Sequence, residues 1–178
     1  MKKILIVFVL LCFKSFGQRF EGQNFCEEVK SSSYFPLDIE SKKIFWYTTF
    51  YVETNKGKVV KGGKEYFSFE QKWNNTNVDV LLLREENGKV VQYDEKSNTD
   101  FIRFDNSFKV GQTWKAGEVE YEIIAYDGEL KTPYCNYKGL MVMEAKYPKV
   151  TYRFYYLKGM GYVGATRDGK LVSCVTPE

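Results

Sequence analysis

The sequence contains no histidine. Histidine supplies the general base of Ser-His-Asp and Cys-His catalysis, is a common zinc ligand, and changes charge near neutral pH. Its absence excludes those catalytic arrangements in their usual forms, together with the common zinc sites. It also excludes a pH switch based on histidine.

Long hydrophobic runs are scarce as well, and the only one spans Ile4–Phe13. Two lysines precede it, and the small residues Ser15 and Gly17 follow it at the positions of a signal-peptidase site. As a helix, these ten residues would be about 15 Å long, roughly half the thickness of a membrane's hydrocarbon core. We therefore predict a signal peptide over residues 1–17, a periplasmic or secreted product, and no transmembrane anchor after processing.

Cys12 leaves a second interpretation of this segment open, in which a lipoprotein peptidase cuts before it and its thiol is acylated. Such a peptidase prefers a small residue at the preceding position, whereas Leu11 is bulky. The cleavable signal peptide is therefore the preferred prediction.

The rest of the chain has no net charge. The formal charge of +3 belongs to Lys2, Lys3 and Lys14, which the predicted cleavage removes. Nucleic acids and anionic membranes need a sustained basic surface on their partners, so neither is expected to bind. A local lysine cluster is predicted to be the solvated rim of a hairpin, and it consists of Lys56, Lys58, Lys61 and Lys64.

Cysteine is sparse too, since only Cys26, Cys135 and Cys174 follow the predicted signal. In an oxidising compartment they allow one disulfide and one odd thiol. Cys135 and Cys174 are the favoured pair because both lie in the C-terminal half, although Cys26 could replace either. The spacings match no metal site, so we expect a structural bridge rather than a redox or nucleophilic role.

Turn residues divide the chain into short strands. Asn87-Gly88 and Asp168-Gly169 each separate two apolar runs, which is the pattern of a type I′ hairpin. We predict an all-β fold, an antiparallel meander of about ten strands that forms a barrel or a strongly bent two-layer sheet. This domain spans 44–178, and residues 18–43 form an N-terminal extension.

Two of the predicted strands, Ile44–Val52 and Val150–Leu157, are aromatic or apolar on both faces. Antiparallel sheets commonly leave one face in water, so these strands need a second cover. The N-terminal extension, a protein partner or a ligand could supply it. The residues predicted to form a ligand or partner surface are Trp46, Tyr47, Tyr51, Tyr152, Tyr155 and Tyr156.

The segment Gly159–Gly164 has the glycine spacing of a dinucleotide-binding fingerprint. That site requires a helix immediately afterwards, whereas Tyr162–Val175 has the pattern of a hairpin. We expect the glycines to serve a tight turn and close strand packing, and we expect no cofactor.

Paired carboxylates are the remaining catalytic option, since a glycosidase places two of them across a sugar. Glu118, Glu120 and Glu122 alternate along one face of a predicted strand, and Asp100 and Asp105 bracket another. Acidic residues that alternate along a strand are typical of its solvated face. We therefore predict no catalytic residue and no metal site.

Four segments carry a resemblance to known proteins: Tyr34–Leu37 (YFPL), Phe45–Tyr47 (FWY), Phe108–Trp114 (FKVGQTW) and Tyr155–Val163 (YYLKGMGYV). Together they resemble exported, β-rich envelope proteins of Gram-negative bacteria, most of them of unknown function. The resemblance implies the fold and an envelope location. It carries no catalytic residue across.

Three functional hypotheses follow from the sequence. The first is a non-enzymatic binding or accessory protein of the cell envelope that acts on an envelope or secreted protein partner, as an immunity-type inhibitor of a toxin does. The alternative is a calycin-like binder of a small apolar or carbohydrate ligand. The third is a carboxylate-dependent hydrolase.

Overall fold

The computed structural model describes residues 25–30 and 32–177, and within them the chain forms twelve antiparallel strands and no helix. This confirms the predicted all-β class, with twelve strands in place of about ten. The predicted signal peptide, 1–17, lies outside the described residues. The strands are β1 (Ser41–Trp46), β2 (Thr49–Lys61), β3 (Lys64–Trp73), β4 (Val78–Glu86), β5 (Lys89–Asp94), β6 (Thr99–Asp105), β7 (Thr113–Ala116), β8 (Val119–Lys131), β9 (Asn136–Tyr147), β10 (Val150–Leu157), β11 (Gly161–Arg167) and β12 (Lys170–Thr176).

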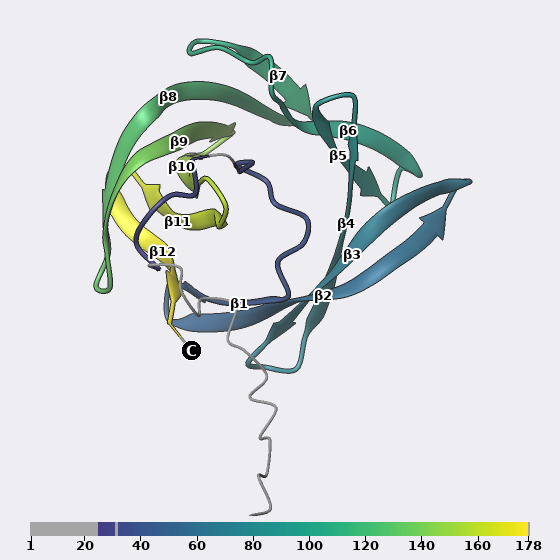
Figure 1. Cartoon of the computed structure of the whole chain (residues 1–178), viewed down its shortest axis with the longest axis horizontal. Coiled ribbons are helices and arrows are strands. Elements are labelled where there is room, and N and C mark those ends of the chain that lie inside the picture. Colours follow the sequence, from purple (N-terminus) through teal and green to yellow (C-terminus); the bar gives the residue numbers. More distant parts are fainter. Residues whose placement is uncertain (1–24, 31, 178) are drawn as a thin grey trace, which may run out of the picture.

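The strands form one sheet that curls into a nearly closed barrel (Figure 1). Each strand pairs with its neighbours in sequence except that β6 does not pair with β7, and β1 also pairs with β12, so β6 and β7 are the two edges. These edges meet at a seam, where the indole nitrogen of Trp114 donates a hydrogen bond to the carbonyl of Ile102 at 3.1 Å.

Both predicted hairpin turns are confirmed. Asn87 and Gly88 have φ values of 52° and 77°, and Asp168 and Gly169 have 50° and 77°. A type I′ turn requires positive φ at both central residues, which asparagine, aspartate and glycine tolerate best. The turn residues therefore fix the register of β4 with β5, and that of β11 with β12 up to a bulge between Ala165 and Thr166.

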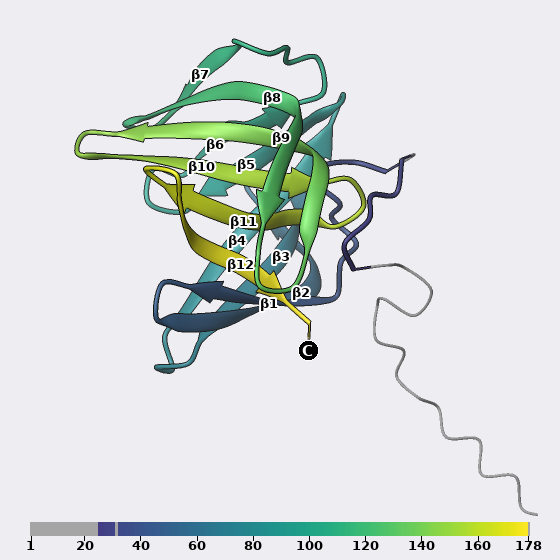
Figure 2. The same cartoon turned by 90° about the vertical axis from the view of Figure 1, so that its left-hand side faces the viewer.

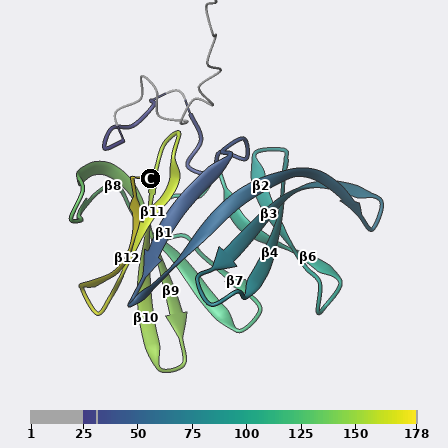
Figure 3. The same ribbon diagram turned by 90° about the horizontal axis from the view of Figure 1, so that it is seen from below.

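The N-terminal extension closes one end of the barrel. The first strand begins at Ser41, three residues before Ile44, and the residues ahead of it form a segment without strands that we call the strap (residues 25–30 and 32–40). Figures 2 and 3 place the strap at one end of the barrel and the β9–β10 and β11–β12 turns at the other. Phe35 of the strap packs between Phe104 and Tyr156, with ring centroids 5.1 Å and 4.6 Å away.

A second core lies outside the barrel. Strands β8 and β9 bend, with register shifts on both sides of Gly128, and their far ends fold over β10–β12 (Figure 2). We call this part, Gly128–Leu140, the outer arm. It lies so close to β11 that a Cβ atom on Gly164 would come within 2.9 Å of the Leu130 side chain. Close packing explains this glycine, as the sequence predicts.

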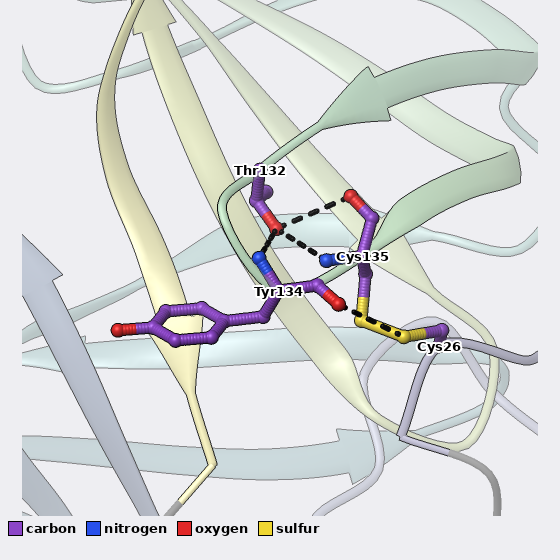
Figure 4. Close-up of a disulfide and its surroundings, with 4 residues drawn as sticks. All are labelled: Cys26, Thr132, Tyr134 and Cys135. Carbon is purple, nitrogen blue, oxygen red and sulfur yellow. Dashed lines mark hydrogen bonds between the residues drawn. A yellow bond between two sulfur atoms is a disulfide. The ribbon is translucent and has the colours of Figure 1, made fainter.

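The disulfide joins the strap to the turn of the outer arm (Figure 4). It links Cys26 to Cys135, with Cα atoms 5.4 Å apart. The hydroxyl of Thr132 shapes the turn by accepting hydrogen bonds from the backbone N–H groups of Tyr134 and Cys135, at 3.2 Å and 3.0 Å.

The favoured pairing of Cys135 with Cys174 is therefore wrong. Cys174 is a free, buried thiol on β12, where its backbone pairs with Phe45 and Gly164. Proximity in sequence is a weak guide to pairing, because doubling the length of a closed loop costs only about 0.6 kcal/mol. The course of the strap across the barrel end brings Cys26 to the outer arm instead.

Candidate functional site

The interior of the barrel contains a cavity of about 210 Å³. The strap covers it with Phe35, Pro36, Leu37 and Ile39, and Trp46 at the end of β1 also borders it. Its wall is aromatic and aliphatic, with a few polar side chains among them. The lining includes Phe35, Leu37, Trp46, Tyr51, Leu81, Leu83, Phe154, Tyr156 and Tyr162, together with Lys42, Glu53, Gln71 and Arg103.

Strand alternation places most of these side chains. Successive residues of a strand point to opposite faces, so Tyr51 and Glu53 on β2 share the inner face, as do Phe154 and Tyr156 on β10.

Arg103 reaches the interior through a β-bulge and not through regular alternation. Val90 pairs with Phe104 and Val91 pairs with Ile102, which leaves Arg103 as the extra residue of a β-bulge on β6. Bulges redirect a side chain relative to the regular pleat. Arg103 lies inside the barrel as a result, and the surface it exposes borders the cavity.

One carboxylate borders the cavity, and its charge is already matched. Glu53 lies 3.6 Å from the ammonium group of Lys42, which is only 8% exposed. Gln71 donates a hydrogen bond to the other oxygen of Glu53 at 2.7 Å. Lys42 also donates to the carbonyl of Met160 at 3.3 Å. This group of residues is therefore internally satisfied.

The guanidinium of Arg103 forms no such close ion pair, although the Glu53 carboxylate attracts it from a greater distance. It donates a hydrogen bond to the amide oxygen of Gln92 at 3.0 Å, and no carboxylate of the described residues lies within 4.0 Å of it. Burial raises the pKa of the Tyr51 and Tyr156 hydroxyls, so these neighbours stay neutral. Burial also raises the pKa of the Tyr162 hydroxyl, which lies near Ser173 of β12.

The aromatic residues predicted as a binding surface separate into three places. Trp46, Tyr51 and Tyr156 line the cavity. Tyr47 and Tyr152 lie beside Trp46 at the turn end, with their hydroxyl oxygens 3.0 Å apart.

Tyr155 lies on the opposite face of β10 from Tyr156. It is buried beneath the outer arm, and its hydroxyl is 3.3 Å from that of Thr166. Tyr155 therefore belongs to the second core and does not border the cavity.

The polar residues of the cavity were missed by the sequence analysis. A visible signal does exist for Arg103, because a single charge interrupts the apolar run of β6 between Ile102 and Phe104. The alternation of Glu53 with Tyr51 is a weaker signal of the same kind. Neither pattern identifies which strands will face each other across the barrel.

The carboxylates considered for catalysis lie elsewhere, and none of them borders the cavity. Glu120 and Glu122 lie 3.8 Å and 2.9 Å from the ammonium group of Lys146. Asp105 accepts hydrogen bonds from the backbone N–H and the hydroxyl of Ser107, at 2.8 Å and 2.7 Å. The contacts of Glu120 and Glu122 thus lie on the surface of the sheet, and those of Asp105 stabilise the turn after β6.

Asp100 is the centre of a network on the outer surface of the sheet. It accepts hydrogen bonds from Tyr66, Lys64 and Arg84 at 2.7 Å, 2.9 Å and 3.0 Å. Burial opposes its ionisation, but these three donors prevail and lower the pKa of Asp100 to about 2. The folded state therefore favours the carboxylate more strongly than the unfolded chain does.

Replacing Asp100 with asparagine should lower stability at neutral pH and flatten its dependence on acid. The folded pKa lies below the unfolded value of 3.8, so the stabilisation is complete above that pH and is lost as pH falls through 2. With partial exposure taken into account, we expect a loss of about 2 kcal/mol at pH 7. Urea unfolding at several pH values measures it. The control is Asp127→Asn, at an exposed position of β8, whose stability should depend on pH as that of the wild type does. If the stability of Asp100→Asn fell with acid as steeply as that of the wild type, the role assigned to Asp100 would be wrong.

In comparisons with known proteins, no protein family, curated protein or solved structure matches the chain. Within residues 25–30 and 32–177, no three Cys, Asp or Glu side chains are grouped so that they could hold a metal ion. The same residues contain no helix that is long and apolar enough to cross a membrane. The candidate site is thus defined by its geometry.

Proposed function

We propose that this protein is an exported, non-enzymatic binding protein that holds a small molecule inside its barrel. The observation that carries the proposal is the cavity of about 210 Å³, with its aromatic wall and few polar groups. Sites for small molecules are concave and mostly apolar, with a small number of polar groups that orient the ligand. The signal peptide predicted over residues 1–17 supports export, and the Cys26–Cys135 disulfide is compatible with an oxidising compartment.

The size of the cavity limits the ligand. An apolar cavity of about 150 Å³ accepts a benzene molecule, whereas drug-sized ligands occupy about 300 Å³ or more. A volume of about 210 Å³ suits a single ring with a short substituent, or a short branched chain. The ligand is therefore smaller than the sugars or long lipids that larger barrels enclose.

Filling the cavity should abolish binding. Leu81 lines the cavity, whereas the preceding residue, Val80, is 55% exposed on the outer face of β4. In the Leu81→Trp variant the indole should occupy the ligand's space and weaken binding at least tenfold. The matched Val80→Trp variant should bind as the wild type does, because its new side chain lies in solvent.

Isothermal titration calorimetry with single-ring probes measures this effect, using benzyl alcohol, phenylacetate and benzylamine so that neutral, anionic and cationic compounds are all represented. Thermal unfolding of each variant shows that it is folded. The proposal fails if no probe binds the wild type, or if Leu81→Trp binds as tightly as Val80→Trp does.

A protein partner is the second proposal, and a groove of about 380 Å³ on the outside of β1 and β12 favours it. Phe45, Tyr47, Tyr134 and Leu171 border this groove and are 40%, 45%, 48% and 38% exposed. Aromatic side chains that are exposed together are enriched at protein interfaces. The two proposals are distinguishable because filling the cavity at Leu81 leaves this groove unchanged. The hydrolase hypothesis stays a prediction without a supporting contact.

A further inference from the structure

The charges that border the cavity do not balance. The titratable groups with a formal charge at its wall are Lys42, Glu53 and Arg103. Lys42 and Glu53 form an ion pair at 3.6 Å, so their charges offset each other. One positive charge remains, on the guanidinium of Arg103.

A guanidinium inside a barrel is costly unless an acceptor of negative charge lies beside it. The groups nearest to it are neutral, since Gln92 accepts one of its hydrogen bonds and the phenols of Tyr121 and Tyr156 lie nearby. The Glu53 carboxylate attracts it from beyond ion-pair distance, but Glu53 is already paired with Lys42, so the three groups together keep one positive charge. A guanidinium carries five N–H donors, so capacity remains for a further acceptor. Its planar fork matches the two oxygens of a carboxylate, which it can bind through parallel hydrogen bonds.

The rest of the wall suits an apolar group attached to such an anion. Trp46, Tyr51 and Phe154 supply aromatic surface in the same cavity as Arg103. The cavity therefore offers an aromatic wall and one cation without a close counter-ion.

We propose that the ligand is a small carboxylate with a single aromatic ring or a short branched chain, and that Arg103 binds its anionic group. This inference rests on the proposed function and specifies the chemical class of the ligand. It assigns Arg103 the role of the residue that selects for charge.

The first test uses the wild-type protein and two probes of nearly the same shape. Phenylacetate carries the anion, and phenylacetamide replaces it with a neutral amide. Calorimetry should give at least tenfold tighter binding for phenylacetate, because hydrogen bonds to charged groups contribute more than neutral ones do. This comparison does not depend on whether any variant folds.

The second test removes the cation. Arg103→Met keeps much of the side-chain volume and should weaken phenylacetate binding at least tenfold, with little effect on phenylacetamide. Arg103→Lys restores a charge without the planar fork and should recover part of the affinity. The control is Arg153→Met, because Arg153 lies on the outer face of β10 and pairs with Glu144 at 2.9 Å. It should bind both probes as the wild type does.

The outcomes separate this inference from the proposed function. Equal binding of the two probes by the wild type, or an unchanged preference in folded Arg103→Met, would overturn the role of Arg103 while leaving a small-molecule site in place. Binding of benzylamine in preference to phenylacetate would overturn it in the same way. Failure of every probe to bind would refute the proposed function itself.

Discussion

Replacing both Cys26 and Cys135 with serine should lower the free energy of unfolding by about 4 kcal/mol. The two cysteines are 109 residues apart, so the disulfide closes a long loop in the unfolded chain. Loop-closure entropy for about 100 residues corresponds to roughly 4.7 kcal/mol, and removal of a native disulfide typically costs 2–5 kcal/mol. Phe35 keeps the strap packed on the barrel without the disulfide. The loss of stability should therefore arise mainly because the unfolded chain gains conformational entropy.

Urea unfolding measures this effect, and peptide mapping by mass spectrometry identifies the bridge directly. The control is Cys174→Ala, which alters a buried thiol outside any disulfide and should cost about 1 kcal/mol or less. If Cys174→Ala were the more damaging change, or if a reducing agent left the wild type unaffected, the assignment of the bridge would be wrong.

Phe104→Ala should destabilise the protein by about 3–5 kcal/mol. Phe104 is 2% exposed, and its ring contacts Tyr34, Phe35 and Phe108, with centroids 6.5 Å, 5.1 Å and 6.2 Å away. It therefore joins the strap, strand β6 and the connection to β7. Truncation removes buried apolar surface and leaves a cavity that these three segments cannot readily fill.

The matched control for this change is Phe45→Ala. Phe45 is 40% exposed, so its truncation should cost about 1 kcal/mol or less. Both variants are compared with the wild type by urea unfolding. A loss below about 1 kcal/mol in Phe104→Ala would show that the strap does not pack against β6 in solution.

The local features of this fold could be predicted from sequence because they depend on neighbouring residues. Asn87-Gly88 and Asp168-Gly169 specify their turns by backbone chemistry alone. The number of strands is harder to predict, since a strand of four residues such as β7 shows little alternation. The aromatic run of β10 correctly indicated a cover on its second face, where Tyr155 packs beneath the outer arm. The prediction of one two-sided strand over Ile44–Val52 was wrong, because a turn at Tyr47 and Thr48 separates β1 from β2 and Phe45 is 40% exposed.

The site depends on contacts between segments far apart in the chain, which a single sequence does not specify. Tyr155 and Tyr156 are chemically identical neighbours, yet one packs beneath the outer arm and the other lines the cavity. The bend of β8 and β9 places the outer arm over the face of β10 that carries Tyr155, and no local pattern in β10 indicates this. Arg103 lies in the cavity because of a bulge against Val90 and Val91, and no turn residue marks its position.

The pairing of β1 with β12 has a consequence for how the chain folds. The hydroxyl of Ser173 on β12 donates a hydrogen bond to the carbonyl of Phe45 on β1, 128 positions earlier in the chain. These two strands join the two halves of the meander. Contacts of such long range are slow to form, and β1 has no second neighbour until β12 has been synthesised. Hairpins can form during translation, but the barrel is completed only afterwards. The barrel thus remains open while the chain is being made.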